Sequence, residues 1–142
     1  MDVPIRRIDK DLPLPEYKTA GAAAMDLSVR EGAAVEPYSV VVFPLNVALK
    51  PPKGHFALMA ARSSLRKRGL MLANNIGIFD EDYAGDGDEY RAALYNFTDT
   101  PVQVERGDRV VQVILLPYDK VQWQEVDTLG TSDRGGMGTT GI

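Results

Sequence analysis

The chain has 142 residues, of which 16 are Lys or Arg and 20 are Asp or Glu, giving a formal net charge of -4. It contains no cysteine and one histidine, which excludes a disulfide scaffold, thiol catalysis and cysteine-ligated metal sites. This length predicts one domain, and the mild acidity argues against a nucleic-acid-binding protein. The sequence shows no membrane span and no apolar signal segment, so we expect a cytoplasmic protein.

Short segments rich in β-branched and apolar residues recur along the chain, separated by Pro, Gly, Asn or Asp. Because helices and strands do not alternate, this spacing predicts an all-β fold, a jelly-roll-like antiparallel barrel or sandwich. Residues 63–68 alone indicate a short helix, with Ser63 at its start and Gly69 at its end. The predicted strands are Met25–Arg30, Ser39–Leu49, His55–Ala61, Tyr90–Phe97, Val102–Glu105, Arg109–Leu116 and Val121–Val126.

The C-terminal sequence TSDRGGMGTTGI is too rich in glycine to contribute to a core. We therefore expect residues 1–130 to form the folded domain and residues 131–142 to form a flexible arm that orders against a ligand. Glycine amides can approach an anion closely, and Arg134, Thr139 and Thr140 add a charge and two hydroxyls. A disordered C-terminus without a function is the alternative interpretation.

The segment ARSSLRKRGL, residues 61–70, places Arg62, Ser63 and Ser64 before the predicted helical turn. A guanidinium, two hydroxyls and free backbone amides suit phosphate oxygens. From this segment alone, a capped surface turn with a solvated basic face is the simpler interpretation.

Six acidic residues lie between Asp80 and Glu89. An EF-hand calcium loop counted from Asp80 fails, because Ala84 and Arg91 occupy two of its ligand positions. Asp80 directly follows the apolar run Ile76–Phe79, and a carboxylate at the end of a strand can act as a general base toward water. A solvated acidic loop is the alternative.

A single amide, Gln112, interrupts the apolar run VVQVILL. If it is buried, it needs a hydrogen-bond partner. A partner across the sheet and a bound ligand are both open at this point.

Five segments in order resemble the five motifs of the homotrimeric dUTPases, and together they span nearly the whole chain. They are AGAAAMDLSV, ARSSLRKRG, NNIGIFDEDYAG, RGDRVVQV and DRGGMGTTG. This resemblance implies a jelly-roll-like fold and a homotrimer whose subunits share active sites. It also implies hydrolysis of dUTP to dUMP and pyrophosphate by water attack on the α-phosphorus, with Mg²⁺. Such an activity would limit uracil in DNA and supply dUMP for dTMP synthesis.

The resemblance also implies a role for individual residues. Asp80 would activate the water, Tyr83 would pack against the deoxyribose, and Asp26 would support the site through hydrogen bonds. Mg²⁺ would be held by the triphosphate without a direct protein ligand, and Asp26 would reach it only through water. The residues expected to bind uracil are Asn74, Gly77, Ile78, Phe79 and Arg91. Those expected to bind phosphates are Arg62, Ser63, Ser64 and Gln112, and those expected to close over the nucleotide from another subunit are Arg134, Met137, Gly138, Thr139 and Thr140.

The chain departs from the family pattern at several positions. Met137 stands where the family usually has a phenylalanine, Ala84 replaces an arginine and Ala61 replaces a proline. A few extra residues lie between Gly85 and Arg91, and the tail is slightly shorter. These changes predict an altered closure over substrate rather than lost chemistry.

Two alternatives belong to other functional classes. A dCTP deaminase shares the fold and an RSS element, but it would need a catalytic glutamate where this chain reads YRAALYN, residues 90–96. A non-catalytic interaction module that kept the trimeric β fold is the second alternative.

Overall fold

The computed structural model describes residues 1–136. In these residues the chain forms short strands and a single 3₁₀ helix, Leu65–Arg68, which confirms the all-β prediction. The strands are β1 (Ile5–Arg7), β2 (Met25–Ser28), β3 (Ala33–Val35), β4 (Val40–Pro44), β5 (Val47–Leu49), β6 (His55–Ala61), β7 (Leu70–Leu72), β8 (Ile76–Phe79), β9 (Arg91–Asn96), β10 (Val102–Val104) and β11 (Arg109–Pro117).

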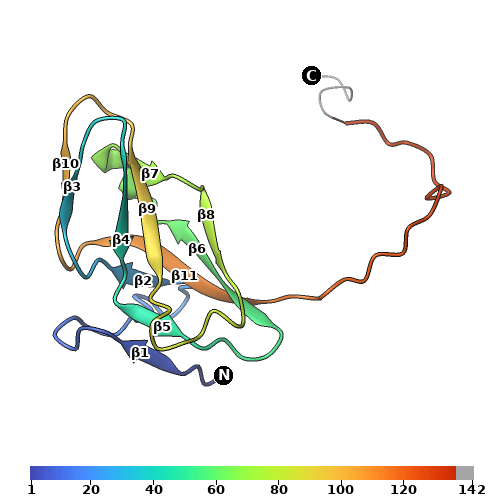
Figure 1. The fold of residues 1–142 in the computed structure, drawn as a ribbon, viewed down its shortest axis with the longest axis horizontal. Coiled ribbons are helices and arrows are strands. Elements are labelled where there is room, and N and C mark those ends of the chain that lie inside the picture. The colour runs from blue at the N-terminus through green and yellow to red at the C-terminus, as the bar shows by residue number, and fades with distance from the viewer. Residues whose placement is uncertain (137–142) are drawn as a thin grey trace.

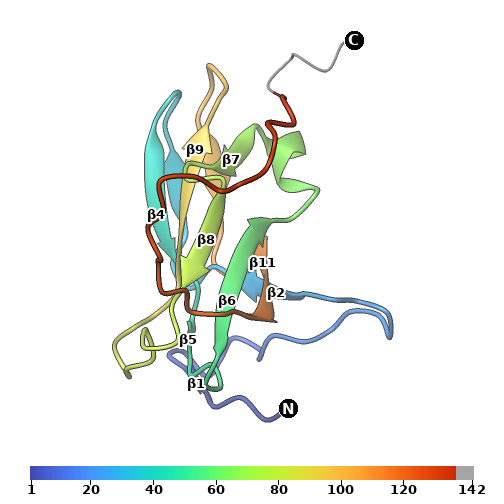
Figure 2. The same ribbon diagram turned by 90° about the vertical axis from the view of Figure 1, so that its right-hand side faces the viewer.

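The strands pair in four antiparallel sheets (Figures 1 and 2). The largest has the order β2-β11-β6-β8, the next has the order β4-β9-β7, and β1-β5 and β3-β10 form two-stranded ladders. In Figure 2 the sheet with β4 and β9 lies to the left of the sheet with β6 and β11. Among the described residues no sheet closes on itself, so the architecture is a jelly-roll-like sandwich rather than a closed barrel.

The core lies between these sheets. Leu27 and Met59 from the largest sheet share one buried apolar cluster with Phe43 and Leu94 from the three-stranded sheet. Strands β6, β7 and β9 contribute alternate residues, as expected when one face of a sheet is buried and the other is exposed, whereas all three residues of β5 are buried. No helix of the described chain is long and apolar enough to cross a membrane.

The structure corrects the sequence prediction in three places. The predicted strand Ser39–Leu49 divides at Asn46, whose φ is 68°, and its two parts join different sheets. The predicted helix is a 3₁₀ turn preceded by Ser64 rather than Ser63, and no side chain caps it. Gly69 ends this turn with a φ of 78°, as predicted.

The third correction concerns the segment Val121–Val126, which is not a strand. Residues 119–135 are all exposed, and Figure 1 shows the chain after β11 running away from the sheets. A strand needs a neighbour for its backbone hydrogen bonds, and this segment meets none in the described chain. The regular structure therefore ends before residue 130, and the division into a domain and an arm stays a prediction.

A buried asparagine, Asn96, joins the end of β9 to its surroundings. Its side-chain amide donates to the carbonyl oxygens of Val35 at 2.9 Å and Thr100 at 2.8 Å, and its oxygen accepts from the backbone amide of Thr98 at 2.9 Å. These bonds satisfy backbone groups where the chain turns from β9 toward β10. They therefore link the end of the β4-β9-β7 sheet to the β3-β10 ladder.

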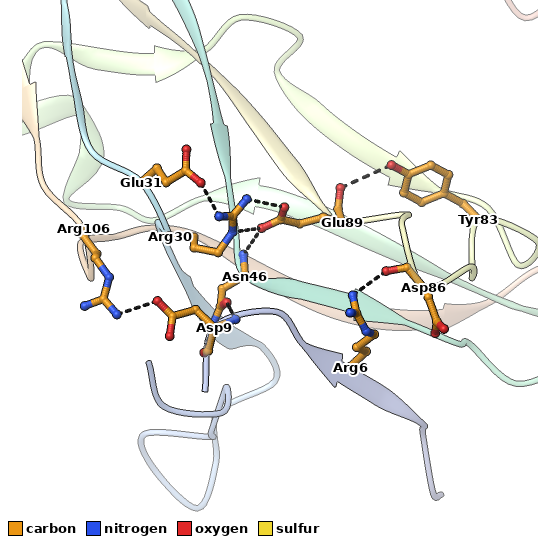
Figure 3. A network of polar contacts seen from close by, with 9 residues as sticks. All are labelled: Arg6, Asp9, Arg30, Glu31, Asn46, Tyr83, Asp86, Glu89 and Arg106. Carbon is orange, nitrogen blue, oxygen red and sulfur yellow. Dashed lines mark hydrogen bonds and ion pairs between the residues drawn. The ribbon is translucent and has the colours of Figure 1, made fainter. Parts of the chain in front are cut away.

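A buried carboxylate, Glu89, organises the acidic loop before β9 (Figure 3). It accepts hydrogen bonds from Arg30 Nε at 2.8 Å, Arg30 Nη2 at 2.9 Å and the backbone amide of Asn46 at 2.9 Å. Burial would raise the pKa of the Glu89 carboxyl, but the Arg30 guanidinium and the Asn46 amide outweigh burial and hold that pKa below its ordinary value. Glu89 is thus ionised and paired in the folded protein.

The bonds of Asn96 predict a large loss of stability in Asn96→Ala. The substitution leaves two carbonyl oxygens and one amide without partners, so we expect the free energy of unfolding to fall by about 2–4 kcal/mol. Denaturant titration measures this change, with Asp99→Ala, an exposed position in the same loop, as the control. Equal stabilities of the two variants would contradict the assigned role of Asn96.

The lowered pKa of Glu89 predicts a specific acid dependence of stability. A depressed pKa stabilises the fold fully above the unfolded value of about 4.3, and that stabilisation is lost as pH falls through the folded pKa. Glu89→Gln should therefore cost about 2 kcal/mol at pH 7, and the gap to the wild type should narrow below about pH 4. Denaturant titrations across this range test the prediction, and a gap independent of pH would contradict it.

Candidate functional site

The first part of the site lies at the end of β8. Asp80 follows the last residue of this strand directly and is exposed. The backbone amide of Tyr83 donates to the Asp80 carbonyl oxygen at 3.1 Å, which closes a turn and brings the Tyr83 side chain back toward the strand. The structure thus places the predicted catalytic carboxylate and the predicted sugar-packing ring on one turn.

Three aromatic rings meet beside this turn. The rings of Phe79 and Tyr90 are stacked, with centroids 3.7 Å apart, and the Tyr83 ring lies 6.0 Å and 6.1 Å from them. Tyr90 is completely buried, its hydroxyl has no hydrogen-bond partner among the described residues, and burial raises the pKa of its phenol. Tyr83 is 37% exposed, so part of the residue is accessible to a ligand.

Strand β8 has a free edge. It pairs with β6 on one side, whereas β9 pairs with β4 and β7, so no ladder joins β8 to β9 in the described chain. Asn74 is exposed in the turn before β8, and Arg91 is exposed at the start of β9. Along β8 itself, Ile78 is 61% exposed and Gly77 is buried. The uracil-binding residues predicted from the sequence therefore surround an edge whose backbone amides and carbonyls can pair with a planar polar ligand.

The second part of the site lies at the other end of β6. Arg62 Nε contacts Asp26 Oδ1 at 3.1 Å, and Arg109 Nη1 contacts Asp26 Oδ2 at 3.1 Å. Arg62 Nη1 also donates to the carbonyl oxygen of Arg109 at 3.0 Å. One carboxylate between two guanidiniums leaves a net positive charge here, and the exposed Ser63 and Ser64 lie directly beside it.

Gln112 stands in this second part of the site, opposite Asp26 on one side and Ala60 on the other. Its Nε2 donates to the carbonyl oxygen of Ala61 at 3.1 Å. The amide therefore has a partner across the sheet, which was one of the two alternatives. Its binding of a phosphate stays a prediction.

The two parts are far apart within one chain. Phe79 stands opposite Ala57 in the β6–β8 ladder, and Arg62 lies five residues farther along the chain. A strand advances about 3.3 Å per residue, so Asp80 and Arg62 are separated by roughly 16–20 Å along the sheet. The structure brings together the residues of each part but not the two parts.

The arm supplies the last predicted residues. Arg134 is exposed on the segment after β11, which runs away from the sheets (Figure 1). Met137, Gly138, Thr139 and Thr140 lie outside the described residues. The described part of the chain contains no group of three His, Cys, Asp or Glu side chains that could hold a metal ion.

Sequence analysis missed three residues that support the first part. The Glu89 carbonyl oxygen accepts from the Tyr83 hydroxyl, and the Tyr90 ring lies 6.1 Å from the Tyr83 ring. Glu81 accepts hydrogen bonds from the Gly54 amide at 2.7 Å and the Tyr118 hydroxyl at 2.9 Å. These two donors lower the pKa of the Glu81 carboxyl. Side chains of a strand alternate between its two faces, so the buried Ala92 and Leu94 would have indicated that Tyr90 also points inward. No sequence signal separates the two glutamates from the other acidic residues of the loop.

Comparison of the sequence with known proteins assigns the chain to one family. The dUTPase family model matches residues 10–141. The deoxyuridine 5'-triphosphate nucleotidohydrolase of Dictyoglomus turgidum is 40% identical over 145 residues, covering 97% of each chain. That of Corynebacterium diphtheriae is 36% identical and covers 99% of this chain and 93% of its own.

Solved structures agree with the sequence matches. The dUTPase from Streptococcus mutans superposes with a TM-score of 0.76 at 32% identity, covering 84% of this chain and 98% of its own. The dUTPase of Staphylococcus bacteriophage 80alpha superposes with a TM-score of 0.86 over 99% of both chains, and at 19% identity this likeness shows the fold alone. Since the family match spans nearly the whole chain and includes both parts of the site, the chain belongs to the dUTPase family.

Proposed function

We propose that this chain hydrolyses dUTP to dUMP and pyrophosphate in active sites shared between the subunits of a homotrimer. The observation that carries the proposal is the separation of Asp80 from the Arg62 cluster by the length of β6. A carboxylate that activates water must lie near the phosphorus that the water attacks, and the guanidinium must bind the same phosphate chain. A second copy of the chain would bring the two parts together.

The substrate follows from the first part of the site and from the relatives. The free edge of β8 and the Asn74 side chain suit the polar edge of uracil, and the Tyr83 ring suits the face of a deoxyribose. Curated relatives at 33–40% identity carry the name deoxyuridine 5'-triphosphate nucleotidohydrolase. The phage 80alpha dUTPase was solved with dUpNHpp, which supports a triphosphate ligand for this fold.

In the proposed reaction, Asp80 orients a water molecule and accepts its proton as the water attacks the α-phosphorus, and pyrophosphate leaves. Arg62 and Gln112 of one subunit, with Arg134 of another, bind the phosphates and reduce the charge that develops during transfer. Ser63 and Ser64 add hydroxyl donors, and Asp26 holds the Arg62 guanidinium in position.

The residues of the second part of the site are compatible with a magnesium ion that is bound by the phosphates of the substrate. Mg²⁺ usually binds phosphate oxygens and water with few protein ligands, and Asp26 already accepts from two guanidiniums. We therefore infer that the triphosphate would hold the ion, with Asp26 within reach only through water, and that the ion would neutralise phosphate charge when bound.

The proposed activity would keep uracil out of DNA and supply dUMP for dTMP synthesis. The deaminase alternative finds no support in β9, which contains no glutamate. Asn96, the last residue of this strand, is buried, and its side-chain amide donates to two backbone carbonyl oxygens.

The proposed role of Asp80 predicts that Asp80→Asn loses turnover while the protein stays folded, because the position is exposed. We expect kcat for pyrophosphate release from dUTP to fall by about 10²–10⁴-fold, with nucleotide binding retained. Asp82→Asn, two residues along the same exposed loop, is the matched control and should retain activity.

The same assay compares dUTP with dCTP, dTTP and UTP in the presence of Mg²⁺. Selective turnover of dUTP that is lost in Asp80→Asn supports the proposal. Ammonia release from dCTP would assign the chain to the deaminases, and turnover retained in Asp80→Asn would remove Asp80 from the reaction.

If active sites are shared between subunits, mixing two inactive variants should restore activity. Asp80→Asn and Arg62→Gln should each lose activity, whereas trimers formed by refolding the two together contain some sites with both wild-type residues. For random mixing we expect about a quarter of the wild-type activity to return. A mixture as inactive as its components would show that Asp80 and Arg62 must act from the same chain.

A further inference from the structure

The position of the Tyr83 ring depends on a backbone carbonyl. Its hydroxyl donates to the carbonyl oxygen of Glu89 at 3.3 Å, which is long for a bond between a hydroxyl and an oxygen. The rings of Phe79 and Tyr90 lie about 6 Å from it at tilted angles. These contacts limit the tilt of the ring, and the hydroxyl bond is the one hydrogen bond of its side chain within residues 1–136.

The loop that joins Tyr83 to Glu89 does not anchor the ring. It contains Gly85 and Gly87, which are both exposed. Its described hydrogen bonds are two turn bonds between Gly85 and Asp88, from the Gly85 amide to Asp88 Oδ2 at 2.7 Å and from the Asp88 amide to the Gly85 carbonyl oxygen at 3.1 Å, and one bond from Arg6 Nη1 to the Asp86 carbonyl oxygen at 2.7 Å.

The Glu89 side chain provides the anchor that the loop lacks (Figure 3). Its carboxylate is 8% exposed and receives two bonds from Arg30 and one from the Asn46 amide. Both donors are themselves held in place. The backbone amide of Arg30 donates to Pro44 at 2.8 Å, and the Asn46 side chain exchanges two hydrogen bonds with the backbone of Asp9.

We propose that Glu89 and Arg30 determine the selectivity for deoxyribose by fixing the position of the Tyr83 ring. A ring that cannot move excludes a 2'-hydroxyl, because the hydroxyl would lose its water against an apolar face and gain no partner. A ring that can move by a fraction of an ångström admits it. Glu89 and Arg30 are positioning residues, since neither would touch the nucleotide. This inference rests on the proposed function, in which the sugar lies against Tyr83.

Steady-state kinetics with dUTP and UTP test the inference through the ratio of their kcat/KM values. A general loss of folded protein lowers both values equally and leaves the ratio unchanged. Glu89→Gln keeps the size of the side chain but removes its charge, and we expect the selectivity for dUTP to fall by about two- to tenfold. Tyr83→Phe removes the hydroxyl bond to the Glu89 carbonyl oxygen without disturbing the Glu89–Arg30 pair and should give a similar fall.

Glu31→Gln is the matched control. Glu31 also pairs with Arg30, but its side chain is 67% exposed, and the described structure gives it no hydrogen bond or ion pair to the loop of Tyr83. This variant should keep the wild-type ratio. The double variant Glu89→Gln with Tyr83→Phe should show no further fall beyond either single variant, because both changes remove one restraint.

The possible outcomes separate this inference from the proposed function. A wild type that does not hydrolyse dUTP would overturn both. A wild type selective for dUTP, with an unchanged ratio in folded Glu89→Gln, would overturn the inference alone. If Glu89→Gln does not fold, Tyr83→Phe decides: a lowered ratio supports the inference, and an unchanged ratio overturns it.

Discussion

Strand β6 carries both parts of the candidate site, and its length keeps them apart. One end of the strand adjoins the acidic turn after β8, and the other leads into Arg62 and the basic 3₁₀ turn. Because an extended chain cannot bend back within seven residues, no rearrangement of side chains brings Asp80 to Arg62. In the proposed function this constraint is the reason that a second copy of the chain is needed, and it also separates opposite charges that would otherwise pair with each other.

Charge pairing has different functions at the two ends. Near Arg62, the carboxylate of Asp26 orients guanidiniums that remain partly exposed and free to bind an anion. Near Tyr83, the buried Glu89 carboxylate pairs with the partly buried Arg30, and the Glu89 carbonyl oxygen accepts from the Tyr83 hydroxyl, so this pair is proposed to fix an aromatic surface. A buried pair adds little net stability once the cost of removing charges from water is included. Its geometric precision explains better why a charged side chain is buried next to the residue that holds the Tyr83 hydroxyl.

Much of the fold could be predicted from local pattern. The alternation in Arg91–Asn96 and the apolar run in Arg109–Pro117 identify strands because one or both faces must be buried. The three-residue strands β1, β3 and β7 could not be found this way. Ile5 pairs with Leu49, which lies 44 positions farther along the chain. So short a segment forms a strand only through its hydrogen bonds to that distant partner. The segment Val121–Val126 has the composition of a strand but meets no partner in the single chain.

The order of residue types along the chain was sufficient to indicate the family and the individual candidate residues, because phosphate and base chemistry require particular side chains at short spacing. Only the tertiary structure showed which of these residues lie together and which do not. Glu89 illustrates the difference, since in the sequence it is one acid among six and in the fold it meets an arginine 59 positions away. Burial and ion pairing depend on contacts between distant segments, and local sequence carries no signal for them.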